Sequence, residues 1–175
     1  MKQRVLLRAL RVRLALFDVD GVLTDGRVYL SATGETFKAF HILDGLGLKM
    51  LAASGVTLGA ISGRKSAAAA RRARETGLAH LMLGVDDKLA AYRKLLRRLS
   101  VSEEETAYMG DDLPDLPVLR RCGLALSVPG AADLVRAHAH YVTMRPGGEG
   151  AVREVCELIM HAQGTLDGQQ ESYLA

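Results

Sequence analysis

Two short apolar runs of this sequence end abruptly in carboxylates, within the segments ALFDVDG and AYMGDD. The first run leads into Asp18 and Asp20, and the second leads into Asp111 and Asp112. Carboxylates brought together from two segments repel one another and need a divalent cation, and an all-oxygen ligand set favours Mg²⁺. A carboxylate can also attack phosphorus to give an aspartyl phosphate, while a second one protonates the leaving oxygen. Together these residues predict metal-assisted phosphoryl transfer.

Ser62 and Lys88 supply the other groups that this chemistry requires. Ser62 follows the apolar run TLGAI, and Lys88 opens the basic segment KLAAYRKLLRRL. A hydroxyl and an ammonium group neutralise charge on the transferring phosphoryl oxygens. Taken singly, each feature has a structural alternative: Asp-x-Asp-Gly is a common turn, a serine after a strand is commonly a helix cap, and a lysine on a basic helix is commonly solvated. The acids at 111, 112 and 115 could also stabilise a helix N-terminus.

The elements that must position these residues alternate along the chain. Strands are expected at 14–17, 57–61, 80–83, 106–109, 124–127 and 141–143, and helices at about 45–53, 66–77, 88–99, 113–122, 133–137 and 151–162. This alternation predicts an α/β fold, a Rossmann-like parallel sheet flanked by helices. Ligands bind outside the carboxyl ends of the strands in such sheets. We therefore expect Asp18, Asp20, Ser62, Asp111 and Asp112 to converge at one edge.

Two further segments complete the expected organisation. Residues 27–30 and 35–40 alternate in polarity around the turn Ser31-Ala32-Thr33-Gly34, which predicts a projecting β-hairpin at about 27–40. The polar tail at about 164–175 is expected to be loose. The length of 175 residues suits one domain spanning 1–175.

Composition narrows the class of protein. With 49% hydrophobic and 25% charged residues, the chain has the proportions of a soluble globular protein. A net charge of +3, the absence of Trp and an aromatic content of 5% argue against a nucleic-acid partner. Cys122 and Cys156 are isolated, which favours a reducing compartment, and no apolar run is long enough to cross a bilayer. A cytoplasmic protein without a membrane partner is expected.

The four features resemble the motifs of the haloacid dehalogenase superfamily of phosphatases. DVDGVLTDG resembles its first motif, which implies that Asp18 is the nucleophile and Asp20 the acid/base. ISGR, with Ser62 as a phosphoryl ligand, resembles the second; Lys88 is placed like the third, and GDDLPD like the fourth. The resemblance implies a Mg²⁺ site formed by Asp18, the main-chain carbonyl of Asp20, and Asp111. Whether Asp112 and Asp115 contribute is left open.

The segments between the motifs resemble one branch of that superfamily, the 3-deoxy-D-manno-octulosonate 8-phosphate phosphatases. The gaps between the motifs are taken up by the hairpin and by predicted strands and helices, so no cap domain is expected. The branch implies a homotetramer whose subunits complete each other's sites through the hairpin, the Gly147–Gly148 loop and the tail. It implies a sugar-acid phosphate as substrate, with a set of substrate-binding candidates: Asp20, His41, Asp44, Gly45, Lys49, Gly63, Arg64, Arg72 and Lys88.

Two departures from the branch keep other substrates open. Leu43 and Glu149 stand where the family often has Arg, and Lys49 also replaces an Arg. Because an Arg pairs with a sugar carboxylate and a Leu cannot, a phosphatase for a nine-carbon N-acylneuraminate or KDN 9-phosphate is an alternative. A non-catalytic oligomeric homologue would be expected to lack a motif residue, and none is missing. A phosphotransferase with another acceptor is a further alternative.

Overall fold

The fold is built on a parallel sheet whose strands are short and fully apolar. The computed structural model describes residues 3–174, and its six-stranded sheet has the order β5-β4-β1-β6-β7-β8, with every pair parallel. The strands are β1 (Leu14–Phe17), β4 (Thr57–Ser62), β5 (His80–Leu83), β6 (Thr106–Met109), β7 (Leu124–Ser127) and β8 (Tyr141–Val142). The predicted α/β class with a Rossmann-like parallel sheet is confirmed.

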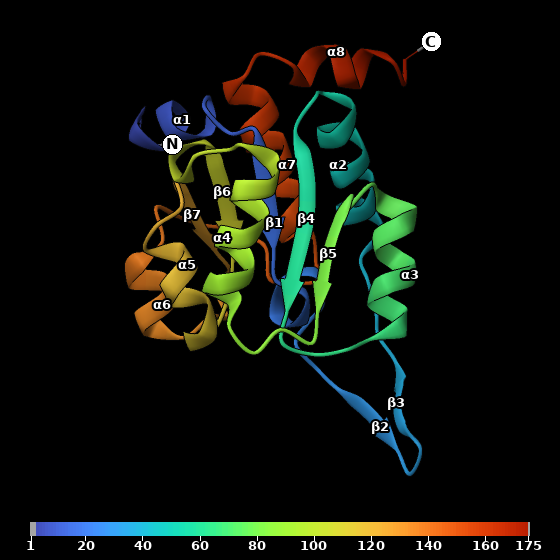
Figure 1. Ribbon diagram of the computed structural model, residues 1–175. Coiled ribbons are helices and arrows are strands. Elements are labelled where there is room, and N and C mark those ends of the chain that lie inside the picture. The colour runs from blue at the N-terminus through green and yellow to red at the C-terminus, as the bar shows by residue number, and fades with distance from the viewer. Residues whose placement is uncertain (1–2, 175) are drawn as a thin grey trace.

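Helices cover both faces of the sheet (Figure 1). One layer holds α1 (Gln3–Ala9), α2 (Ile42–Ala53), α3 (Ala67–Thr76) and α7 (Ala151–Ala162), and α2 packs along α7. The other layer holds α4 (Lys88–Leu99), α5 (Leu116–Leu119) and α6 (Asp133–His138). The core between them is apolar and includes the fully buried rings of Phe17, Tyr92 and Tyr108. None of the helices within residues 3–174 is long and apolar enough to span a membrane.

Local hydrogen bonds define several of the element ends. The Ser66 hydroxyl accepts a hydrogen bond from the Ala69 amide and caps α3, which ends at Gly77 in the left-handed region. Asp87 caps α4 in the same way. The Asp25 side chain accepts a hydrogen bond from the Arg27 amide, two residues later, which holds a turn at this point.

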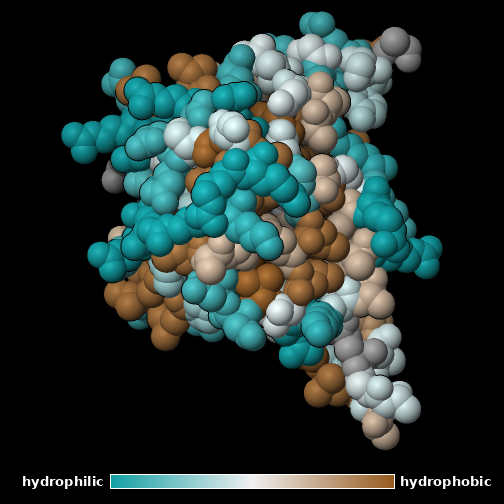
Figure 2. Space-filling model, in the orientation of Figure 1, coloured by the Kyte–Doolittle hydropathy of each residue, from teal (hydrophilic) through white to brown (hydrophobic). Residues whose placement is uncertain are grey.

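The hairpin projects from the body of the molecule below the sheet in Figure 1. Its strands are β2 (Tyr29–Ser31) and β3 (Gly34–Phe37), and the rings of Tyr29 and Phe37 stack with their centroids 4.3 Å apart. Leu30 and Phe37 are 69% and 52% exposed, and apolar atoms are visible along this arm in Figure 2. The hairpin thus presents apolar surface that the described chain leaves uncovered.

Three expectations at element level were wrong. The tail carries a short helix, α8 (Leu166–Glu171), whose first residue packs on the core, so residues 164–174 are not simply loose. The helix expected at about 45–53 begins earlier, at Ile42, because His41 is its extended N-cap residue. The segment 113–122 is a 3₁₀ turn at Leu113–Asp115 followed by the short helix α5.

Candidate active site

The strand register brings the predicted residues to one edge of the sheet. Phe17 at the end of β1 is paired with Ala60 of β4 and with Met109 of β6. The chain therefore leaves β1 and β6 at the same level, while β4 continues for two residues to Ser62 at the same edge of the sheet. The Asp18 amide donates to the Met109 carbonyl over 2.9 Å, which aligns the first and fourth motifs. The expected convergence of Asp18, Ser62 and Asp111 is confirmed, because all three line one cleft of about 520 Å³.

The segment after β1 is a tight turn, Val19–Leu23, that we call the β1 turn. Gly21 has a φ of +82°, and a Cβ built there would lie 2.0 Å from Oδ2 of Asp111. Only glycine satisfies both conditions. The Thr24 hydroxyl holds the turn by accepting hydrogen bonds from the amides of Gly21 and Gly26. The glycine thus lets Asp111 approach the carboxylates that follow β1.

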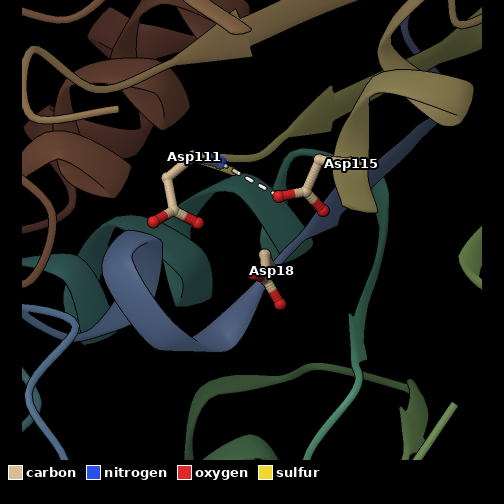
Figure 3. A group of neighbouring side chains, drawn as sticks. All are labelled: Asp18, Asp111 and Asp115. Carbon is tan, nitrogen blue, oxygen red and sulfur yellow. Dashed lines mark hydrogen bonds between the residues drawn. The ribbon is translucent and has the colours of Figure 1, made fainter. Parts of the chain in front are cut away.

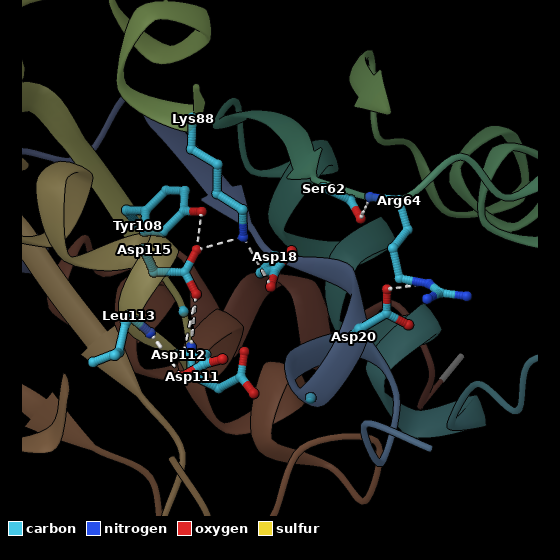
Figure 4. A network of polar contacts seen from close by, with 12 residues as sticks. Asp18, Asp20, Ser62, Arg64, Lys88, Tyr108, Asp111, Asp112, Leu113 and Asp115 are labelled. Atoms are coloured by element: carbon cyan, nitrogen blue, oxygen red, sulfur yellow. Dashed lines mark hydrogen bonds and ion pairs between the residues drawn. The ribbon is translucent and has the colours of Figure 1, made fainter. Parts of the chain in front are cut away.

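A buried polar chain runs from the strand ends into the interior (Figure 4). Nζ of Lys88 lies 3.0 Å from Oδ2 of Asp18 and 2.7 Å from Oδ1 of Asp115. The same Asp115 oxygen accepts a hydrogen bond from the Tyr108 hydroxyl over 2.6 Å. Lys88 is 7% exposed and Asp115 is fully buried, so the structural alternative of a solvated lysine is wrong.

Asp115 also shapes the loop that carries Asp111. Its Oδ2 accepts hydrogen bonds from the amides of Asp111 and Asp112, over 3.1 and 3.2 Å. With Oδ1 engaged by Lys88 and Tyr108, both oxygens of Asp115 already have two donors each. Asp115 therefore organises the site, and its carboxylate has no lone pair left for a metal ion. The Asp112 side chain, in contrast, caps the 3₁₀ turn through the Leu113 amide.

The remaining carboxylates fit a divalent cation. Oxygens of Asp18 and Asp111 lie within 4.8 Å of each other and of the already occupied Asp115 carboxylate (Figure 3). Burial and the charge of Asp115 raise the pKa of Asp18 to about 7 and that of Asp111 to about 6. Oδ1 of Asp111 is buried and has no hydrogen-bond partner among residues 3–174. A cation placed between Asp18 and Asp111 would satisfy this oxygen and offset the repulsion, and oxygen ligands suit Mg²⁺.

Asp20 lies on the other side of the cleft in an ion-pair cluster. Its Oδ1 contacts Nζ of Lys38, whose side chain is 1% exposed, and its Oδ2 lies 3.8 Å from Nε of Arg64 (Figure 4). The Asp20 carboxylate is thus held apart from Asp18 and faces the cleft. Ser62 is nearby, where its hydroxyl accepts a hydrogen bond from the Arg64 amide over 3.2 Å.

Several predicted substrate-binding residues lie outside the lining of this cleft. Asp44 is buried and accepts hydrogen bonds from the amides of Gly150 and Arg153, so it caps the N-terminus of α7 from α2. Arg72 donates to the His41 carbonyl over 3.2 Å. It also passes close to Gly45, where a Cβ would lie 2.1 Å from Nη2 of Arg72. The Arg72 guanidinium is therefore held against the start of α2. Lys49 is exposed on α2. Substrate binding by His41, Asp44, Gly45, Lys49 and Arg72 stays a prediction.

The Gly147–Gly148 loop packs directly on the β1 turn. The Gly148 amide donates to the Val22 carbonyl over 3.0 Å, and a Cβ at Gly147 would lie 1.8 Å from the carbonyl oxygen of Gly21. Glu149 is exposed at a second, smaller cleft that Asp111 also lines. Within one chain, this loop therefore packs against the β1 turn and supports the site rather than covering it.

Three residues of the site were not assigned a role by the sequence. Lys38 follows the hairpin with no motif around it, and Tyr108 is one of several apolar residues of β6. Only Asp115 had a signal, its spacing within GDDLPD. The burial of Lys38 beside Asp20 and of Asp115 beside Lys88 can be recognised only in the three-dimensional structure.

Comparisons with known proteins agree with this geometry. The family model described as haloacid dehalogenase-like hydrolase matches residues 69–154. The chain is 46% identical over 164 residues to the 3-deoxy-D-manno-octulosonate 8-phosphate phosphatase KdsC of Yersinia pestis, covering 94% of this chain and 88% of that protein.

Two solved structures are similar over almost the whole chain. The enzyme of that type from Moraxella catarrhalis, in complex with magnesium, phosphate and KDO, has a TM-score of 0.96 and 43% identity, with 99% of each chain covered. The cobalt-bound deoxy-D-mannose-octulosonate 8-phosphate phosphatase of Haemophilus influenzae has a TM-score of 0.91 and 36% identity, covering 96% of this chain and 99% of that one.

Proposed function

This chain belongs to the 3-deoxy-D-manno-octulosonate 8-phosphate phosphatases of the haloacid dehalogenase-like hydrolases, and on that premise we propose that it hydrolyses this sugar-acid phosphate to 3-deoxy-D-manno-octulosonate and phosphate. One observation carries the proposal: Asp18, Asp20, Ser62, Lys88 and Asp111 line a single cleft in a chain that is this similar to those enzymes. The cleft holds the groups required for a phosphomonoesterase.

Asp18 is proposed as the nucleophile. Its carboxylate attacks phosphorus, the bond to the sugar oxygen breaks, and an aspartyl phosphate forms. Lys88, held between Asp18 and Asp115, and the hydroxyl of Ser62 neutralise charge on the phosphoryl oxygens. Mg²⁺, when held by the carboxylates of Asp18 and Asp111 and the main-chain carbonyl of Asp20, supplies positive charge that offsets repulsion between the nucleophile and the phosphate.

Asp20 is proposed as the proton-transfer group. It protonates the leaving sugar oxygen in the first step and removes a proton from water in the second, so one carboxyl serves both steps. The Asp20 side chain is paired with Lys38 and Arg64. It is therefore separate from Asp18 and Asp111, the carboxylates proposed to bind the metal, which supports this role. Arg64 is 47% exposed in the cleft and is the candidate to pair with the substrate carboxylate. Gly63 lies beside it.

The chain is further proposed to act as one capless domain, residues 1–175, within a cytoplasmic homotetramer. The support for assembly is the projecting hairpin with Leu30 and Phe37 exposed. The support for a reducing compartment is that Cys122 and Cys156 are free and buried. In such an assembly a neighbouring subunit's hairpin, Gly147–Gly148 loop or tail would complete the open cleft.

A second substrate, a nine-carbon sialic-type sugar acid 9-phosphate, is kept open by one departure from the family pattern. Leu43 stands where the family often has Arg, and it is 41% exposed at the start of α2. Because a leucine cannot pair with a carboxylate, selection for the eight-carbon substrate rests on other cations.

The proposal is tested by measuring phosphate release from the eight-carbon 8-phosphate and the nine-carbon 9-phosphate, with Mg²⁺ and with EDTA. The expected result is Mg²⁺-dependent release with a higher kcat/KM for the eight-carbon substrate. A higher kcat/KM for the nine-carbon substrate would establish the alternative. No release from either substrate in the presence of Mg²⁺ would reject the proposed activity.

A further inference from the structure

Tyr108 lies beneath the site and is connected to it by a single hydrogen bond. Its ring is fully buried in β6, and its hydroxyl donates to Oδ1 of Asp115 over 2.6 Å. Burial and the neighbouring carboxylates hold the pKa of the phenol well above its usual value, so it remains a donor. No step of the proposed reaction uses this residue, yet its hydroxyl ends the polar chain that begins at Asp18.

The oxygen that Tyr108 contacts is shared with Lys88. Oδ1 of Asp115 accepts from both Lys88, at 2.7 Å, and Tyr108, while Nζ of Lys88 also lies 3.0 Å from Asp18. Within the described residues, these contacts use two of the three N–H bonds of the ammonium group, and the third is available to a phosphoryl oxygen. The strength of the interaction between Asp115 and Lys88 therefore determines how well the ammonium group can stabilise charge on the phosphoryl oxygens.

We propose that Tyr108 is a positioning residue for phosphoryl transfer, which acts through Asp115 to keep Lys88 available to the phosphoryl group. A carboxylate oxygen with two donors divides its charge between them. Without the tyrosine hydroxyl, Oδ1 of Asp115 binds Lys88 alone and more tightly, and the ammonium group is drawn away from Asp18. The inference rests on the proposed phosphatase activity.

The chain offers a matched control, a second buried tyrosine whose hydroxyl contacts β6. Tyr92 is also fully buried, and its hydroxyl is 2.7 Å from the hydroxyl of Thr106. Tyr92 lies one turn after Lys88 on α4, and Thr106 lies two residues before Tyr108 on β6. The substitution of Phe at 92 therefore removes a buried tyrosine hydroxyl that links α4 to β6, without touching Asp115.

The experiment compares Tyr108→Phe with Tyr92→Phe and wild type, in steady-state hydrolysis of the eight-carbon 8-phosphate with Mg²⁺ and in thermal unfolding. We expect kcat of Tyr108→Phe to fall about tenfold, equivalent to about 1.4 kcal/mol in the barrier. KM is expected to change less than threefold, because Ser62 and Arg64 still line the cleft. The inhibition constant of orthovanadate should rise in parallel with the loss in kcat. Tyr92→Phe should lose similar thermal stability and keep its kcat.

A kcat for Tyr108→Phe within twofold of Tyr92→Phe would overturn the inference, and so would a rise in KM at unchanged kcat. The path through Asp115 is tested in an Asp115→Asn background, where adding Tyr108→Phe should cost less than twofold. A further loss of tenfold there would also overturn it.

If Tyr108→Phe does not fold, 3-fluorotyrosine at 108 keeps the ring and makes the hydroxyl a stronger donor. It should then change kcat at least twofold relative to the same replacement at 92, and equal values would overturn the inference. An inactive wild type would instead refute the proposed function.

Discussion

Replacing the nucleophile is expected to stabilise the metal-free protein. Burial and the charge of Asp115 raise the pKa of Asp18 from 3.8 to about 7, with Lys88 only partly offsetting them. The folded state therefore binds the Asp18 proton more tightly than the unfolded state does. The stability that this proton contributes is complete below about pH 4 and is lost as the pH rises through about 7. Asp18→Asn has no such charge to bury.

The size of the effect follows from the pKa difference. About three pKa units correspond to at most about 4 kcal/mol between the protonated and ionised forms. For a chain of this length, that is about 10 °C in Tm. At pH 8 in EDTA, the Tm of Asp18→Asn should be up to about 10 °C higher than that of wild type. At pH 4 the two Tm values should be close. Mg²⁺ at pH 8 should reverse the order, because wild type keeps both carboxylate ligands.

The assay is thermal unfolding of both proteins at pH 4, 6 and 8, with EDTA and with Mg²⁺. Asp133→Asn serves as the control, because the Asp133 side chain is 93% exposed. The Tm difference between Asp133→Asn and wild type should be the same with Mg²⁺ and with EDTA. The reasoning is refuted if Asp18→Asn is less stable than wild type in EDTA by the same margin at every pH.

Three other substitutions probe the residues around the nucleophile. Lys88→Met should lower kcat about 10²- to 10³-fold in the phosphate-release assay, because it removes a charge that stabilises the transition state; a loss below fivefold would contradict its role. Lys38→Met should lower kcat about tenfold or more and leave the binding constant of Mg²⁺ unchanged, since Lys38 contacts the Asp20 carboxylate, which is not proposed as a metal ligand; weakened Mg²⁺ binding in calorimetry at unchanged kcat would argue against this. Asp44→Ala should cost about 1–2 kcal/mol in the free energy of unfolding, because it removes the cap of α7. Its KM should stay the same, and a tenfold rise in KM would instead assign Asp44 to the substrate.

The sequence predicted the parts of this protein that depend on local pattern. Apolar runs that end in polar residues identified β1, β4 and β6, and parallel register then required Asp18, Ser62 and Asp111 to meet at one edge. The caps at Ser66 and Asp87 depend on side chains only three residues away from their partners. Both kinds of signal are short-range.

What the sequence did not predict depends on contacts between distant segments. The sequence did not indicate that the Asp44 carboxylate accepts a hydrogen bond from the N-terminus of α7, more than 100 residues away. Lys38 contacts Asp20 only because the hairpin returns to the β1 turn. Tyr108 is a separate case: it has the pattern of an ordinary strand residue, and its hydrogen bond to Asp115, seven residues away, depends on how the 3₁₀ turn at Leu113–Asp115 folds back toward β6.

The most direct test of the proposed chemistry is to trap the covalent intermediate. Wild type should be mixed with the eight-carbon 8-phosphate and Mg²⁺, quenched in acid within milliseconds, and digested for mass spectrometry. The peptide that contains Asp18 is predicted to gain the mass of one phosphoryl group on that residue, and Asp18→Asn should show no such gain. Steady phosphate release from wild type with no modified Asp18 peptide, or with the phosphoryl group on another residue, would contradict the assignment of Asp18 as nucleophile.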